Sequence, residues 1–331
     1  MKLISYPEDY SPLLADNFFH FEGADPAVST EIYFFSEEGE PLGARRYAGR
    51  SEIDSSPRAI LKRTLNPGPA ERLALGVVRP EGREVGLSVA VGEGGDRGPV
   101  VRFAANLLPL LSSAVVGPAE QTRRLSPADY DEVSLLLAEG ERLTVECAAE
   151  GEGEWVSLPV SFECERAGLY VLVFTAESLL AAAPSALQRG EMVLRVKIDG
   201  DTKAHIRLLL CPASRNNHRV AWLDAYGAIR HHTFDTQSVE RVGVERSESD
   251  TLRGTLTLGV ESWRSVGLHS GPLSQAEMDY LKGVVCSPRV WLLEGDEWVE
   301  CCVEESVCRC GVAEVLSLSL TLRPSRKSRV W

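Results

Sequence analysis

Four of the eight cysteines lie close together near the end of the chain, where thiolates could in principle hold a zinc ion. They are Cys301, Cys302, Cys308 and Cys310. Structural zinc sites favour Cys-x-x-Cys pairs, because the two intervening residues aim both sulfurs inward. Adjacent Cys301 and Cys302 would point to opposite faces of a strand, so at most three thiolates converge. We therefore expect no metal site here, but small buried side chains in a hairpin.

Histidines are the next side chains that could do chemistry. His231 and His232 are adjacent, and neighbouring residues on a strand cannot chelate one ion. The nearest downstream acid, Asp235, is offset from His232 by an odd number of residues, so it would lie on the other face. The remaining histidines have no regularly spaced partner: His20, His205, His218 and His269. Because a general base needs an oriented neighbour, no catalytic histidine is expected.

Known catalytic and nucleotide-binding motifs are missing from the sequence. The glycine-rich segment Gly92–Gly98 lacks the G-x-G-x-x-G order, and no helical pattern follows it to aim an N-terminus at a phosphate. No G-x-S-x-G, H-E-x-x-H or Walker sequence occurs. A glycosidase-type carboxylate pair stays open, since acids are plentiful and no pair stands out. The sequence thus favours a protein that is not an enzyme and uses no cofactor.

Composition limits the class of protein further. A length of 331 residues suggests two or three domains of ordinary size. A net charge of −13 argues against binding to nucleic acid or to anionic membranes, since both require an excess of Lys and Arg. No apolar stretch is long enough to span a bilayer, so no membrane insertion is expected. The N-terminal apolar run breaks at Pro7, which predicts no signal peptide, synthesis in a cytoplasm and reduced thiols.

The elements that would position these side chains are mostly strands. Short β-branched and aromatic runs, punctuated by Gly and Pro about every 8–12 residues, are typical of sandwiches and barrels. The sequence predicts a mainly β fold of two or three β-sandwich- or barrel-like units, with one clear helix in the C-terminal unit. A first boundary falls at Gly117-Pro118. The expected units are residues 1–116 with an N-terminal arm, residues 117–211, and residues 212–331 with a basic tail.

Individual strands and hairpins can be placed from local signals. Asp199-Gly200 between two apolar runs predicts a type I′ hairpin, because both central residues need positive φ. Residues 224–227 predict a second hairpin turn. Residues 251–260 alternate as a single strand. From Leu316 to Leu322, leucines alternate with hydroxyl residues, which predicts a strand with one buried and one wet face.

One helix is predicted with clear ends. Ser274 and Glu277 form a Ser-x-x-Glu capping box, which predicts a helix over residues 275–286. Its apolar side consists of Tyr280, Leu281, Val284 and Val285. A shorter helix is expected within residues 177–188, broken at Pro184.

The C-terminal segment is basic in an otherwise acidic chain. It runs from Arg323 to Trp331 and contains four basic residues. A solvated tail after the last strand is one interpretation. The other is a docking peptide for an acidic partner surface, with Trp331 as the anchor.

Two stretches of the last third resemble a known family. Residues 222–234 resemble a W-L-N-x-x-G-G-x-x-x-x-T-F hairpin, and residues 273–303 resemble the helix, hairpin and strand that follow it. We associate both with tail structural proteins of phages and prophages in Bacteroidetes-type bacteria. The match departs at Asp224, where Asn is usual, and at Ala228, where a second Gly is usual. The residues that would carry structural or interaction roles are Trp222, Tyr226, Gly227, Phe234, Trp291, Trp298 and Trp331.

The resemblance implies a function in assembly. It suggests a structural protein of a tail tip or baseplate, like a distal tail protein, made in the host bacterial cytoplasm and incorporated into the virion tail. Its partners would be further copies of itself, arranged in a ring, and other tail or baseplate proteins. The alternative is a carbohydrate-binding or adhesive sandwich protein with an exposed aromatic platform. The tryptophans that could form such a platform are Trp155, Trp222, Trp263, Trp291 and Trp298.

Overall fold

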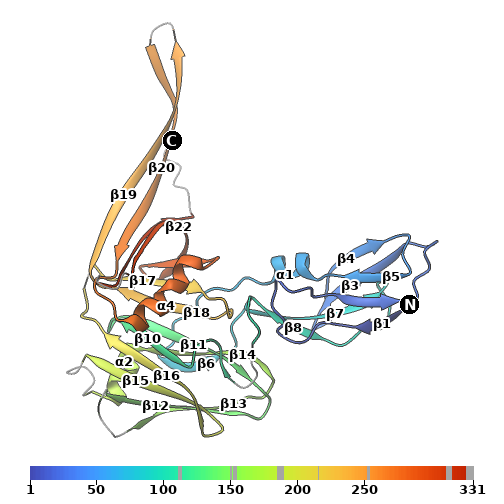
Figure 1. The fold of residues 1–331 in the computed structure, drawn as a ribbon, viewed down its shortest axis with the longest axis horizontal. Coiled ribbons are helices and arrows are strands. Elements are labelled where there is room, and N and C mark those ends of the chain that lie inside the picture. Colours follow the sequence, from blue (N-terminus) through green and yellow to red (C-terminus); the bar gives the residue numbers. More distant parts are fainter. Residues whose placement is uncertain are drawn as a thin grey trace.

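The chain folds into three β-rich units, from one of which a long two-stranded arm projects (Figure 1). The computed structural model describes residues 1–110, 114–149, 151, 155–184, 190–214, 216–251, 254–310 and 315–325. The prediction of a mainly β fold in several sandwich-like units is confirmed. None of the helices in these ranges is long and apolar enough to cross a membrane.

The N-terminal unit is a sandwich of two antiparallel sheets, ordered β1-β2-β5 and β4-β3-β7-β8. The strands are β1 (Lys2–Ser5), β2 (Phe19–Glu22), β3 (Thr30–Ser36), β4 (Pro41–Tyr47), β5 (Glu52–Ser55), β7 (Glu84–Val91) and β8 (Val101–Ala104). Alternate residues of both sheets fill the space between them, as period-2 patterning requires. The most deeply buried aromatic side chains are Phe19, Phe21, Phe34 and Phe103.

The middle unit is a second sandwich, with sheets ordered β6-β14-β11-β9 and β10-β16-β15-β12-β13. Its strands are β6 (Leu75–Val78), β9 (Ala114–Val115), β10 (Glu120–Leu125), β11 (Tyr130–Leu137), β12 (Arg142–Ala149), β13 (Val156–Glu163), β14 (Gly168–Thr175), β15 (Glu191–Ile198) and β16 (Asp201–Leu210). The predicted hairpin at Asp199-Gly200 joins β15 and β16, and both residues have positive φ. β11 and β14 are buried along their whole length, as expected of strands covered on both faces.

Strand β6 departs from the expected division of the chain. It precedes β7 in sequence and falls within the expected unit 1–116, but it pairs with β14, where Val78 lies opposite Val171. The apolar residues at 73–78 predict a strand but do not indicate whether it joins a sheet of the N-terminal unit or of the middle unit. Because register and partner are fixed by tertiary packing, sequence spacing alone assigned this strand to the wrong unit.

The C-terminal unit is a seven-stranded antiparallel sheet ordered β18-β17-β21-β22-β23-β20-β19. Its strands are β17 (His218–Leu223), β18 (Ile229–Phe234), β19 (Gln237–Thr251), β20 (Gly254–His269), β21 (Val290–Glu294), β22 (Glu297–Arg309) and β23 (Ser317–Pro324). The predicted hairpin at residues 224–227 joins β17 and β18. In β23 the leucines are buried as predicted. Ser317 and Thr321, which were expected on a solvent-exposed face, are buried too. This strand lies between β22 and β20, which cover both of its edges.

Strands β19 and β20 form the arm. The two strands pair along their length, from Gln237 opposite His269 to Thr251 opposite Gly254. In contrast, β20 pairs with β23 only over residues 266–269. The rest of the ribbon therefore continues alone beyond the sheet (Figure 1). The single strand predicted over residues 251–260 is wrong, because Thr251 ends one strand and Gly254 begins the next. The polar residues before Thr251 gave no apolar alternation from which the first strand could be recognised.

Three helices accompany the sheets within the described ranges. The predicted helix is α4 (Gln275–Cys286), and both hydrogen bonds of its capping box are present. The expected helix within residues 177–188 corresponds to α2 (Ala176–Ala182), which ends before Pro184, and residues 185–188 of the expected range lie outside the described residues. A helix that the sequence did not predict, α1 (Arg58–Thr64), follows Pro57 in the N-terminal unit. Its seven residues are too few to display a clear helical periodicity.

Candidate functional site

Three of the aromatic side chains singled out by the resemblance, Trp222, Phe234 and Trp291, are buried in the C-terminal unit. Trp222 is fully buried, and its ring packs edge-on against Tyr280 of α4 at 5.2 Å between centroids. Gly283 provides the room, since a Cβ there would lie 2.8 Å from the indole nitrogen of Trp222. Phe234 is also buried, and Trp291 is 4% exposed. Trp222 and Phe234 pack with α4 against the sheet, whereas Trp291 packs with Ala105 and Leu223. Being buried, these side chains leave little surface for a partner.

The β17–β18 turn contacts the N-terminal unit. Tyr226 is half-buried, and Gly227 has a φ of +81°. A Cβ on Gly227 would lie 3.2 Å from the backbone of Ala105, so this glycine permits a close approach of the two units. Asp224 stabilises the turn, because its Oδ1 accepts from the backbone N–H groups of Tyr226 and Ala228 at 2.9 Å. Trp331 lies outside the described residues.

The cysteine cluster has the alternation expected of a strand. Cys301 is buried and Cys302 is exposed. Cys308 is half-buried and Cys310 is exposed beyond the end of β22. The prediction of small buried side chains is therefore confirmed for Cys301 and wrong for Cys302 and Cys310. Burial raises the pKa of Cys301 to about 12, which keeps it a thiol. Within the described ranges, no group of three or more His, Cys, Asp or Glu side chains is placed to hold a metal ion.

The strongest concentration of charge is a buried cluster where the units meet. Asp131 on β11 is fully buried between two guanidinium groups. Its Oδ1 lies 2.5 Å from Nη1 of Arg123, and its Oδ2 lies 3.0 Å from Nη2 of Arg219. Burial alone would raise the pKa of Asp131, but the two arginines hold it below its ordinary value. Since Arg219 comes from β17, this ion pair links the middle and C-terminal units.

Glu132, the next residue, connects all three units. Arg83, which precedes β7, places Nη1 2.6 Å from Oε1 of Glu132. The backbone N–H of Ala70 donates to Oε2 at 2.7 Å, and Nε2 of His231 on β18 lies 3.6 Å from the same oxygen. Burial would raise the pKa of Glu132, but Arg83 and His231 lower it to about 2. The carboxylate therefore stays ionised in a site without water access.

The two adjacent histidines occupy opposite faces of β18, as predicted, and both are fully buried. Burial lowers the pKa of His231 in spite of the nearby Glu132. Burial, with Arg124 and Arg219 nearby, lowers the pKa of His232 well below its ordinary value. Both rings are thus neutral at neutral pH, and neither has access to solvent. Sequence reasoning missed their role as parts of a joint between units.

An aromatic contact closes the joint on one side. The indole N–H of Trp298 on β22 donates to the hydroxyl of Tyr130 on β11 at 2.5 Å. The Tyr130 hydroxyl in turn donates to the carbonyl of Ala70 at 2.7 Å. The rings of Trp298 and His231 lie 5.3 Å apart, nearly perpendicular. Trp298 therefore has a role in holding units together, and burial raises the pKa of Tyr130 to about 12.

A second contact runs along β10. Arg124 places Nε 2.8 Å from Oε1 of Glu277 on α4 and Nη1 2.8 Å from Oδ1 of Asp235. Arg230 on β18 places Nε 2.6 Å from Oδ2 of Asp224, and its Nη1 donates to Gln121 at 2.9 Å. Every one of these groups already has a partner from another element. The arrangement can fix the relative position of the units but offers no free acid, base or nucleophile to a substrate.

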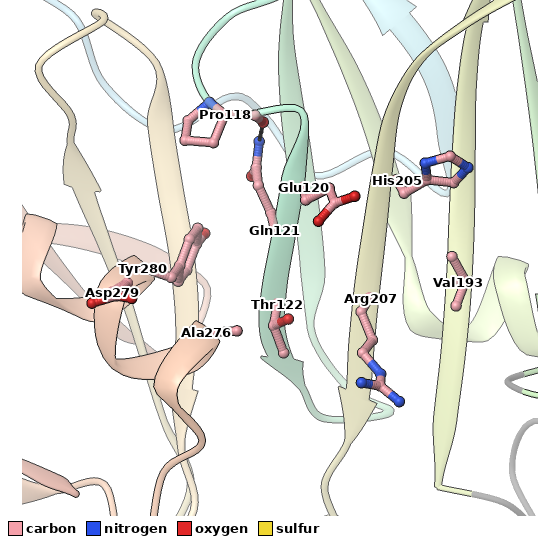
Figure 2. A pocket seen from close by; sticks show the side chains of 10 residues that line it. All are labelled: Pro118, Glu120, Gln121, Thr122, Val193, His205, Arg207, Ala276, Asp279 and Tyr280. Atoms are coloured by element: carbon pink, nitrogen blue, oxygen red, sulfur yellow. Dashed lines mark hydrogen bonds between the residues drawn. The ribbon is translucent and has the colours of Figure 1, made fainter. Parts of the chain in front are cut away.

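Clefts on the surface lie apart from this cluster. One of about 530 Å³ lies between α4 and strands β10, β15 and β16 (Figure 2). Its lining residues are Pro118, Glu120, Gln121, Thr122, Val193, His205, Arg207, Ala276, Asp279 and Tyr280. Asp279 already accepts from Gln275 and Lys282, and Arg207 lies 2.9 Å from Glu191. The cleft has room for a small polar molecule, but its lining residues include no nucleophile beside an oriented base.

A second cleft, of about 450 Å³, is more apolar. It lies where α1, the N-terminal segment and the β17–β18 region meet, and its walls include Leu13, Leu61, Leu107 and Leu223. Neither cleft is lined by Asp131, Glu132 or the arginines that pair with them, although Gln121 lines the first cleft and Asp224 the second. The buried charges are therefore structural, and no active site is evident from either cleft.

The arm is the feature with the most unpartnered surface. Strand β19 lies at the edge of the sheet and pairs with β20 alone in the described part of the chain. Its valines are exposed, with Val242 at 72%, Val244 at 45% and Val239 at 44%. On β20, Leu258 is 67% exposed. A long edge strand with exposed β-branched residues is a template for pairing with another strand.

Comparison with known proteins gives no family assignment. No protein-family model matches the chain, and no curated protein matches its sequence. One similar solved structure is a fragment of S. aureus TarS, residues 217–571, at 8% identity and a TM-score of 0.19, covering 82% of this chain and 68% of that one. Another is a multidomain protein including DUF1735 from Bacteroides ovatus, at 10% identity and a TM-score of 0.17, covering 64% of this chain and 90% of that one. Likenesses this weak carry no functional argument.

Proposed function

We propose that the chain is a non-enzymatic structural protein of a phage or prophage tail tip or baseplate, which assembles with copies of itself and with other tail proteins. The observation that carries this proposal is the β19–β20 arm. It extends beyond the sheet with an unpaired edge and exposed valines, which an isolated molecule leaves in water. Elements of this kind are stabilised when a neighbour in an assembly pairs with them.

The joint between the units supports the same proposal. A structural component must transmit load without changing shape, and Glu132 connects the three units through Arg83, Ala70 and His231. Asp131 adds two more ion pairs in the same buried region. The most distinctive chemistry of the chain is thus used to fix its own geometry, and the arm remains for contacts with other molecules.

The carbohydrate-binding alternative has less support. A sugar platform needs an exposed aromatic face, but Trp222 and Trp291 are buried. Arg195 covers the ring of Trp155 at 3.7 Å, and the ring of Trp263 lies against Gly243. Trp298 is engaged with Tyr130. Trp222 and Trp291 are therefore closed to a sugar, and Trp155, Trp263 and Trp298 each already contact another part of the chain.

The test is the protein composition of purified particles. Particles induced from the source and banded by density should contain this chain in fixed proportion to the tail-tube protein, measured by quantitative mass spectrometry. In a variant with a shortened arm, residues 245–261 are replaced by an Asn-Gly turn that joins Val244 to Ser262, which lie opposite each other in the ribbon. It should fold but be lost from particles, whereas Arg46→Ala, at an exposed ion pair on the N-terminal sandwich, should be retained. Particles that lack the chain, or a purified chain that binds a glycan array, would contradict the proposal.

A further inference from the structure

The edge strand β19 contains a segment that is complementary to itself when reversed. From residue 240 to residue 246 the sequence reads Glu-Arg-Val-Gly-Val-Glu-Arg. Read backwards, each Glu falls opposite an Arg, each Val opposite a Val, and Gly243 opposite itself. The segment is regular, because the bulge in β19 comes only after Ser247. It carries two acids and two bases, so it adds no net charge to a chain whose overall charge is −13.

We propose that two copies of this chain pair antiparallel through their β19 edges, about a two-fold axis that passes beside Gly243. Residues that face each other directly across an antiparallel pair lie on the same face of the joined sheet. Glu240 of one copy then lies opposite Arg246 of the other, and Arg241 opposite Glu245. Val242 lies opposite Val244. Because the axis repeats each contact, the interface contains four opposite-charge pairs and two valine pairs.

The hydrogen-bonding pattern of an antiparallel sheet permits this register. Alternate residues of an edge strand aim their N–H and C=O groups outward, and only residues of the same parity can pair across a two-fold axis. Every pair in the proposed register joins residues of equal parity, as Arg241 with Glu245 and Val242 with Val244 do. The backbone groups that β20 leaves unpaired on β19 would therefore meet those of the second copy.

The two faces of the arm are each prepared for this contact. On one face, Val242 and Val244 are 72% and 45% exposed, and pairing would cover both. On the other, the indole of Trp263 lies over Gly243, so close that a Cβ there would be 2.3 Å from the ring. With glycine at the axis, β19 itself contributes no side chain at the position where the two copies approach.

The charges select a second copy over an unrelated strand. Charged residues on an edge strand normally prevent pairing, because most partners cannot match them. Here the spacing matches its own reverse.

The inference goes beyond the proposed function, because a two-fold contact differs from the head-to-tail contact that closes a ring. It also requires no particle for its test. The test is sedimentation equilibrium of the purified full-length chain at concentrations up to about 0.5 mM. We expect reversible dimers, which either Arg241→Glu or Glu245→Arg weakens about tenfold, since each variant sets like charges opposite each other twice.

Mixing the two variants provides the decisive measurement. In a mixed pair, the acid introduced at position 241 lies opposite the base introduced at position 245, and Glu245 lies opposite Arg241. The mixture should therefore dimerise with about the affinity of the parent, although each variant alone dimerises about tenfold more weakly. Both substitutions are at exposed positions, so the variants should melt like the parent. A parent that stays monomeric, or a mixture no tighter than its components, would overturn the proposal.

Discussion

Replacing Glu132 by Gln tests the role of the buried joint. Glu132→Gln keeps the size of the side chain but leaves the guanidinium of Arg83 buried without its counter-ion at 2.6 Å. Removing one partner of a buried ion pair costs about 3–5 kcal/mol. The pKa gives a similar magnitude, because lowering it from 4.5 to about 2 corresponds to about 3 kcal/mol of stability. We expect the free energy of unfolding to fall by this amount at pH 7, measured by urea denaturation followed by circular dichroism.

The pH dependence has a definite sign. The pKa of Glu132 is depressed in the folded state, so its contribution to stability is present above the unfolded pKa of about 4.5. That contribution is lost as the pH falls from about 4.5 to about 2, where the folded carboxylate takes up its proton. The parent should therefore lose its advantage over Glu132→Gln across this window.

A matched control separates this effect from simple loss of charge. Glu31 forms an ion pair with Arg46 on the surface, where the arginine side chain is 71% exposed. Exposed pairs contribute about 0–1 kcal/mol, so Glu31→Gln should leave the unfolding free energy nearly unchanged. If Glu132→Gln costs no more than Glu31→Gln, the joint does not hold the units as we infer.

Three further outcomes are expected. Ser274→Ala should lower the free energy of unfolding by about 1 kcal/mol, because it removes the cap of α4. Leu281→Ala should lower it by about 2–5 kcal/mol, because it leaves a cavity under the helix. If urea denaturation shows both variants to be as stable as the parent, the helix is not anchored there. Gly243→Val should displace the indole of Trp263, which a red shift of tryptophan emission would report and an unchanged spectrum would contradict. Elemental analysis of the purified chain should find no stoichiometric zinc, and one zinc per chain that is lost on chelation with unfolding would refute this.

Local signals in the sequence predicted those parts of the fold that local chemistry determines. Asp199-Gly200 adopts positive φ because a tight hairpin demands it, and the Ser274 cap is specified within four residues. The single strand expected at residues 251–260 was wrong because local signals are weak in this part of the chain. Neither strand of the arm is covered by a hydrophobic core along most of its length, so no buried face imposed an alternation of apolar and polar residues.

The joint could not be predicted because its partners are distant in sequence. Glu132 meets Arg83 and His231 only after three separate units have packed. One signal was available, since Asp131 and Glu132 introduce two acids at the start of a strand that is otherwise mostly apolar and is buried throughout. Buried acids of this kind require charged partners. That rule indicates a polar contact between units but does not identify which arginines supply it.

The most direct test of the assembly role is a reconstruction of intact particles by electron cryomicroscopy. We expect density for this chain in the tail tip or baseplate, with the β19–β20 arm reaching a neighbouring subunit and its exposed valines covered. A map in which the chain occupies no position in the tail, or in which every arm extends into solvent, would contradict this account.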